Sequence, residues 1–89
     1  MRRRLSELPV GGRAVVAEVT GSRGVRRRLM ELGLVPGTPV SVVNVAPLGD
    51  PLELDVRGGR LSIRRLEAAG IELTGPFELP APRRLKVIS

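Results

Sequence analysis

The alternation of apolar and charged residues is clearest between residues 52 and 64. Residues 52–56 alternate leucine or valine with a charged side chain, which predicts a strand with one buried face. Gly58-Gly59 follows within two residues and favours a two-residue hairpin loop, because glycine adopts positive φ freely. The pattern therefore predicts a β-hairpin that pairs Val56 with Leu61, Leu54 with Ile63 and Glu53 with Arg64.

A helical period marks the segment that begins at Ser22. Val25, Leu29 and Leu32 recur at i, i+4 and i+7, which predicts a helix with one apolar face. Ser22 stands where an N-cap residue accepts hydrogen bonds from the first turn. Arginines and a glutamate occupy most of the remaining positions, so the other faces of this helix are expected to be in water.

Glycines define the end of this helix and the turn after it. Gly33 is expected to take positive φ after the last helical residue, with Leu34 packing against Leu29 as in a Schellman ending. Pro36-Gly37 has proline and glycine in the order of a type II turn. Gly33, Gly37 and the glycines of the hairpin are therefore expected to be structural turn residues.

Three more segments complete the expected fold. Residues 13–20 and 39–46 are rich in valine and predict strands, and residues 71–73 predict a last strand. Five short strands with one helix after the first favour a small closed sheet, because closure protects strand edges. The predicted class is mainly β, an SH3-like barrel first and an OB-like barrel second. Its expected core is Val15, Val19, Leu29, Leu32, Val42, Leu54, Val56, Leu61 and Ile63.

The C-terminal residues differ from the rest in their prolines. We expect residues 1–73 to form the barrel domain and residues 74–89 to form an extended arm, because prolines interrupt a strand ladder. Leu85 to Ile88 is short, apolar and strand-prone. We expect this arm to pack on its own barrel or on a neighbour's, with Phe77 as its apolar anchor, and packing on a neighbour would make a homo-oligomer. The alternative is a frayed terminus.

Composition narrows the chemistry. The 89 residues include no cysteine and no histidine, which removes disulfides, thiolate nucleophiles and the commonest general base. No apolar run has the length needed to span a bilayer. We therefore expect a protein that is not an enzyme, has no cofactor, does not insert directly in the membrane and resides in the cytoplasm.

The net charge of +6 is a candidate signal for nucleic acid until it is mapped. Six of the fifteen basic residues lie in residues 2–4 and 83–86, so residues 5–82 hold nine basic and nine acidic side chains. Phe77 is the single aromatic residue, so base stacking has no platform. This distribution disfavours nucleic acid as the partner.

Two surface sites are candidates for binding, and the first is a group of carboxylates. Asp50, Glu53 and Asp55 offer oxygen ligands for a loose hard-cation site, with a solvated strand face as the alternative. Without nitrogen or sulfur ligands, we expect no ferrous or zinc binding tighter than about the micromolar range by one chain.

The helix offers a candidate protein-binding surface. An interaction site needs an apolar anchor with a polar rim. Met30 and Leu34 are the candidate anchors, beside Arg26, Arg27 and Glu31. The alternative is that Met30 and Leu34 belong to the core.

The chain resembles the FeoA family over about Leu5 to Leu73, in the opening LSELPVGGRAVVAEV and the run RRRLMELGLVPGTPVSVVNVAPLGDPLELDVRGGRLSIRRLEAAGIEL. The resemblance implies an SH3-like fold. It also implies an accessory role in ferrous iron uptake, by docking on the cytoplasmic part of the FeoB transporter, and thus a place at the inner membrane through that partner. The family is often labelled as binding transition metals. The alternative is a nucleic-acid-binding or metal-regulatory small barrel, because related domains occur in iron-dependent repressors.

Overall fold

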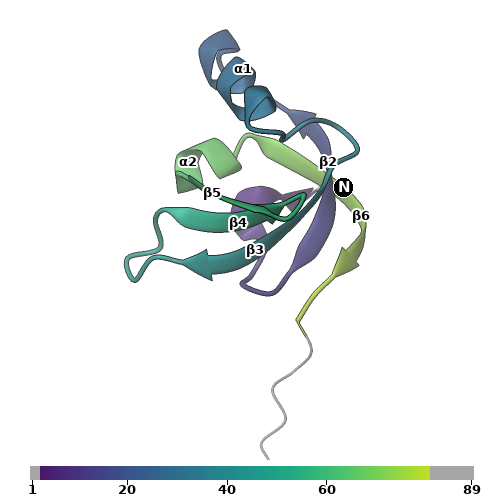
Figure 1. Ribbon diagram of the computed structural model, residues 1–89, viewed down its shortest axis with the longest axis vertical. Helices are drawn as coiled ribbons and strands as arrows, with labels where there is room; N and C mark the ends of the chain where they lie inside the picture. Colours follow the sequence, from purple (N-terminus) through teal and green to yellow (C-terminus); the bar gives the residue numbers. More distant parts are fainter. Residues whose placement is uncertain (1–2, 81–89) are drawn as a thin grey trace, which may run out of the picture.

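The computed structural model describes residues 3–80, which form one antiparallel sheet with three short helical segments (Figure 1). The strands follow one another across the sheet in the order β1-β6-β2-β3-β4-β5. Along the chain the elements are β1 (Arg3–Arg4), the 3₁₀ helix η1 (Leu5–Glu7), β2 (Arg13–Val19), α1 (Arg23–Glu31), β3 (Pro39–Val45), β4 (Leu52–Val56), β5 (Gly59–Ile63), α2 (Arg65–Ala68) and β6 (Ile71–Glu78).

The sheet curls around the core, and η1 and α2 contact each other between its two ends (Figure 1). The predicted mainly β class is therefore confirmed, with the helix α1 inserted after β2. The sequence pattern missed β1, which has two residues and pairs Arg3 with Leu73 and Arg4 with Glu72. Two residues are too few for a periodicity to appear in the sequence.

Arg65 of α2 holds the two ends of the sheet together. Its Nε donates to the carbonyl of Gly49 at 2.7 Å, and its Nη1 donates to the carbonyl of Ser6 at 2.6 Å. Its backbone N–H donates to Asp50 Oδ1 at 2.9 Å. One side chain thus joins α2, which follows the edge strand β5, to η1, which follows the opposite edge strand β1.

The core agrees with the prediction at most positions and differs in β2. Val15 is half-buried, whereas its neighbour Val16 is buried. The pairing of β2 with β6 shifts between Val16 and Glu18, so the inward positions are Ala14, Val16 and then Val19. Leu61 is also half-buried, and it packs against the core from β5. The buried members of the predicted set are Val19, Leu29, Val42, Leu54, Val56 and Ile63.

The hairpin is present, but its turn lies one residue earlier than predicted. Arg57 and Gly58 form the loop with φ of 53° and 80°, and Gly59 is the first residue of β5. The predicted positive φ at Gly59 is therefore wrong. Asp55 Oδ1 accepts the Gly58 N–H at 3.2 Å, which favours the turn at this place.

The earlier turn moves the pairing by two residues along β5. Leu54 pairs with Leu61, and Glu53 pairs with Ser62. Glu53 Oε1 lies 3.4 Å from Nη1 of Arg60, so the predicted pair of Glu53 with Arg64 is wrong. Because side chains alternate with a period of two, this shift keeps the apolar residues on the same face.

The last strand is longer than the predicted residues 71–73. β6 continues to Glu78, which pairs with Arg13, and an irregularity between Val15 and Arg13 of β2 accommodates the strand around Pro76. Proline therefore does not end the ladder there. Phe77 is half-buried against the core, with the Arg3 guanidinium 5.1 Å from its ring centre. The segment Leu85 to Ile88 lies outside the described residues, and the domain boundary after residue 73 stays a prediction.

Candidate partner-binding surface

Helix α1 is defined at both ends by local hydrogen bonds. Ser22 Oγ accepts the Val25 N–H at 3.3 Å, as expected of an N-cap. At the other end Gly33 has φ of 101° and donates to the carbonyl of Met30 at 3.0 Å. Leu34 N–H donates to the carbonyl of Leu29 at 3.1 Å, which completes the predicted Schellman ending.

The same ending decides which leucines are buried. Leu34 is completely buried, so its predicted role as an exposed anchor is wrong. Leu34 follows the positive-φ residue and turns inward to pack with Leu29, which is also completely buried. Leu32, which the helical period assigned to the core, is 44% exposed because it is the C-cap residue.

The outward side of α1 carries the other predicted binding residues. Arg26, Arg27, Met30 and Glu31 line a shallow hollow together with Arg23, a residue that the sequence analysis missed. Their spacing of i, i+3, i+4, i+7 and i+8 places them on one helical face, which we call the α1 face. Met30 is 42% exposed on it, and Arg27 Nε lies 3.6 Å from Glu31 Oε1.

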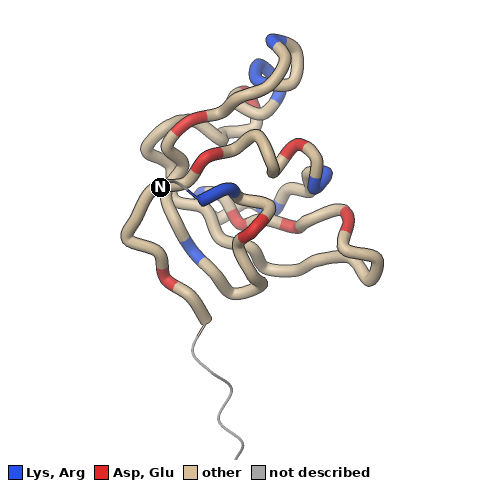
Figure 2. Tube along the Cα trace, turned by 180° about the vertical axis from the view of Figure 1, so that it is seen from behind, with Lys and Arg blue, Asp and Glu red and all other residues tan. Residues whose placement is uncertain are grey.

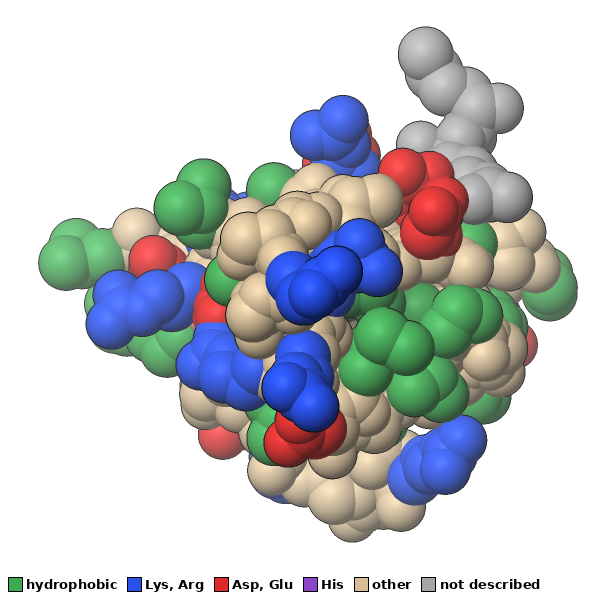
Figure 3. Space-filling model, turned by 90° about the horizontal axis from the view of Figure 1, so that it is seen from above, with side chains coloured by type: hydrophobic (Ala, Val, Ile, Leu, Met, Phe, Trp, Pro, Cys, Tyr) green, Lys and Arg blue, Asp and Glu red, His purple; other side chains and the backbone are tan. Residues whose placement is uncertain are grey.

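Charge is unevenly distributed between this helix and the barrel. α1 contains four arginines and one glutamate, whereas acidic and basic residues are interspersed on the barrel (Figure 2). Seen from above, arginine side chains gather over the helix beside a group of hydrophobic side chains (Figure 3). The α1 face thus combines an apolar side chain with a cationic rim.

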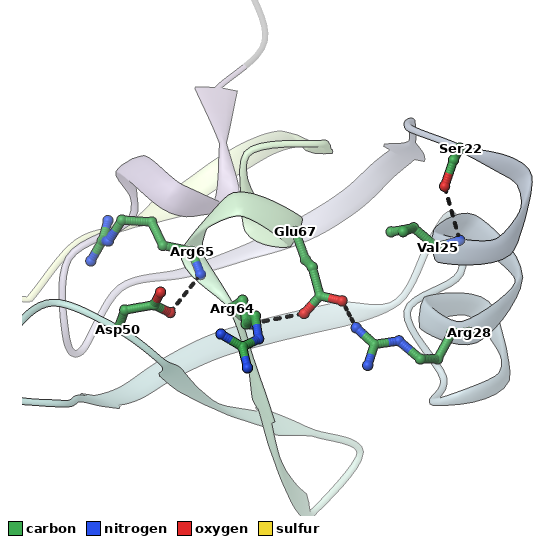
Figure 4. A network of polar contacts seen from close by, with 7 residues as sticks. All are labelled: Ser22, Val25, Arg28, Asp50, Arg64, Arg65 and Glu67. Carbon is green, nitrogen blue, oxygen red and sulfur yellow. Dashed lines mark hydrogen bonds and ion pairs between the residues drawn. The ribbon is translucent and has the colours of Figure 1, made fainter.

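The arginine that points toward the barrel has a structural role. Arg28 pairs with Glu67 of α2, whose Oε1 also accepts the Arg64 N–H at 2.9 Å (Figure 4). The Glu67 side chain is 14% exposed, so this ion pair is better shielded than the pair of Arg27 and Glu31. Arg28 therefore joins α1 to α2, whereas Arg23, Arg26 and Arg27 lie on the α1 face.

The carboxylates considered for a cation are occupied by other contacts. Asp50 accepts from Arg65, Asp55 accepts from Gly58, and Glu53 pairs with Arg60. Among residues 3–80, no three side chains of His, Cys, Asp or Glu are grouped as metal ligands. The prediction of no tight ferrous or zinc site stays a prediction, which anaerobic calorimetry tests.

The fold and the exposed basic helix define a class, a small SH3-like barrel with a charged helix on its surface. The chain belongs to the FeoA domain family, whose model matches residues 3–74. No helix in the described range 3–80 is long and apolar enough to cross a membrane.

Several proteins are similar to this chain over the domain. The Fe(2+) transport protein A/Fe(2+) transporter FeoB fusion protein of Porphyromonas gingivalis is 43% identical over 70 residues, which cover 79% of this chain but only 8% of that relative. The FeoA protein from Chlorobium tepidum is 51% identical, with a TM-score of 0.76 over 80% of this chain and 68% of that chain. FeoA of Stenotrophomonas maltophilia, solved with zinc and described as an SH3 domain protein, is 35% identical, with a TM-score of 0.76 over 86% and 96% of the two chains.

Proposed function

We propose that this chain is an accessory domain for ferrous iron uptake that docks through its α1 face on the cytoplasmic region of a FeoB-type transporter. Membership of the FeoA family supports the role in ferrous iron transport. The relative in which the two proteins form one polypeptide supports the choice of partner. In this proposal the chain acts in the cytoplasm and reaches the membrane through the transporter.

The observation that carries the docking site is the small buried fraction of α1. Of its nine described residues, Leu29 alone is buried, so most of the helix surface is available for contact. Met30 supplies an apolar anchor, and Arg23, Arg26 and Arg27 supply charge around it. Interfaces typically combine a central apolar contact with a charged rim that speeds association. The proposed activity is binding, in keeping with a sequence that has neither histidine nor cysteine.

The test compares Met30→Gln with Leu32→Gln, because these two side chains are 42% and 44% exposed. Binding to the cytoplasmic region of the FeoB-type protein from the same genome is measured by calorimetry. We expect Met30→Gln to weaken binding at least about tenfold, which corresponds to about 1.4 kcal/mol. Leu32→Gln lies off the α1 face and is expected to bind within about twofold of the parent chain, since exposed positions outside the contact contribute little. Equal affinities for the two variants would exclude Met30 as the anchor.

The arginines of the α1 face are tested by kinetics. The double change Arg26→Gln and Arg27→Gln is expected to lower the association rate and its salt dependence, because rim charges steer encounter. Arg60→Gln, at another exposed arginine that pairs with Glu53, is the matched control. A salt-dependent shift on mixing with duplex DNA, in place of transporter binding, would support the alternative nucleic-acid function.

A further inference from the structure

Two leucines are far more exposed than any other large hydrophobic side chain in residues 3–80. Leu48, in the loop between β3 and β4, is 97% exposed, and Leu66, in α2, is 85% exposed. The next most exposed of these side chains is Leu79, at 51%. In Figure 3 hydrophobic side chains project at the left edge, the side on which this loop lies in Figure 1.

Hydrogen bonds hold the two leucines at one junction. Leu48 precedes Gly49, and Leu66 follows Arg65, whose Nε donates to the Gly49 carbonyl at 2.7 Å. The Arg65 N–H also donates to Asp50 in the same loop (Figure 4). The β3–β4 loop and α2 are therefore joined by two hydrogen bonds, one from the side chain of Arg65 and one from its backbone N–H. Binding through a fixed surface loses less conformational entropy than binding through a mobile one.

The surroundings of the leucines indicate which kind of partner fits. A hollow lined by Asp50, Pro51 and Arg64 adjoins the same junction, so the rim carries charges of both signs. A protein groove can place an opposite charge at each of these positions, whereas an anionic lipid surface offers one sign only. Because the leucines project outward, the fitting partner surface is concave and apolar.

We propose that Leu48, Leu66 and Arg64 form a second contact with the transporter, in which the leucines enter an apolar groove with a carboxylate near Arg64. This inference rests on the proposed function, because it assigns the same partner to a second surface. The ion pair of Arg28 with Glu67 connects the two surfaces, since it joins α1 to α2. One partner that spans both surfaces gains affinity from two linked contacts.

The experiment measures binding of the full chain to the cytoplasmic region of the FeoB-type protein. The double variant Leu48→Ser and Leu66→Ser is expected to bind at least about tenfold more weakly, because apolar anchors dominate such contacts. Its melting temperature is expected to match that of the parent chain, since both side chains are exposed. The matched control is Val10→Ser with Leu79→Ser, at side chains 48% and 51% exposed, and it is expected to bind as the parent does.

Three outcomes overturn the inference in different ways. If the parent chain binds and the double variant binds equally well, the second contact is wrong while the proposed function stands. If the parent chain does not bind at all, both proposals fail together. If the double variant loses co-sedimentation with vesicles of phosphatidylglycerol and phosphatidylcholine but keeps transporter binding, the leucines contact lipid and the protein groove is wrong.

Discussion

The two helices of this barrel have contrasting lengths and contacts. α1 has nine residues, of which Leu29 is buried, and it extends away from the sheet (Figure 1). α2 has four residues, yet Arg65 joins it to η1 and to the β3–β4 loop, and Glu67 joins it to α1. The short helix therefore stabilises the closed sheet, whereas the long helix is attached at a few points and exposes most of its surface.

This contrast shows that helix length is a poor measure of structural importance. Isolated helices of nine or fewer residues are marginal in water, so each helix depends on the tertiary contacts that it makes. For α1 these contacts are concentrated at Leu29, the half-buried Val25, the Schellman ending and Arg28. Substitutions at those points, each with a neighbouring control, test the comparison directly.

The largest effect is expected at the buried residue of α1. Leu29→Ala should lower the free energy of unfolding by about 2–5 kcal/mol, the range for truncating a buried leucine. Met30→Ala, at the next position and 42% exposed, should change it by less than about 0.5 kcal/mol. Urea unfolding followed by circular dichroism measures both. Similar losses for the two variants would show that α1 is packed differently.

The next largest effect is expected at Arg65, whose hydrogen bonds connect the two edges of the sheet. Arg65→Ala removes two hydrogen bonds from a charged donor and should cost about 1.5–3 kcal/mol. Arg64→Ala, at an exposed side chain beside it, should cost less than about 0.5 kcal/mol. Thermal unfolding compares the two variants. If Arg65→Ala melts with the parent chain, closure of the sheet does not depend on this side chain.

Two glycines of the α1 region are expected to respond with opposite sign. Gly33→Ala places a side chain at φ of 101° and should destabilise by about 1–2 kcal/mol. Gly24 lies in α1 with open space around it, so Gly24→Ala should stabilise by about 0.5–1 kcal/mol through helix propensity. Chemical denaturation measures both, and a loss of stability in Gly24→Ala would contradict the described helix start.

The smallest effect is expected at the ion pair that joins the helices. Arg28→Gln should cost no more than about 1 kcal/mol, because the arginine is largely exposed. Arg27→Gln, which breaks the more exposed pair with Glu31, should cost about 0.3 kcal/mol or less. Raising the salt concentration to 1 M should reduce the difference between parent and Arg28→Gln. A difference that is independent of salt would mean that Arg28 contributes through packing.

Features that arise from neighbouring residues were predictable from the sequence. Ser22, Gly33 and Leu34 act within one or two turns of α1, and their contacts are those expected. The sequence left open whether Leu34 is buried in the core or exposed as an anchor, because a leucine is apolar enough for both places. Arg23 was missed because the predicted surface was centred on Met30 and Leu34, whereas Arg23 lies two helical turns before Met30.

Features that depend on distant residues were not predictable in the same way. Arg65 reaches Ser6, which is 59 positions away, and no periodicity marks such a contact. The bulge in β2 is hidden because its apolar residues occupy both faces of the strand, so Val15 and Val16 are equivalent in the sequence. The hairpin turn lies one residue earlier than predicted because Arg57 adopts positive φ while Asp55 accepts the N–H of Gly58. The sequence pattern favoured Gly58-Gly59 for the loop because two adjacent glycines are the stronger turn signal.

The hydrogen bond of Arg65 to Ser6, which connects α2 to η1, has a consequence for the motions of the barrel. Across residues 3–80, the recorded bonds between α2 and η1 run through a side chain and not through a ladder of backbone amides. β5 is an edge strand that pairs with β4, and the contact of α2 with η1 adds few bonds on the other side. β5 should therefore detach locally at lower free energy than the central strands β2 and β3, which are paired on both sides. Native-state hydrogen exchange should then show the β5 amides exchanging by a subglobal route, while the amides of β2 exchange only on global unfolding. Equal protection in these strands would mean that the barrel opens as one unit.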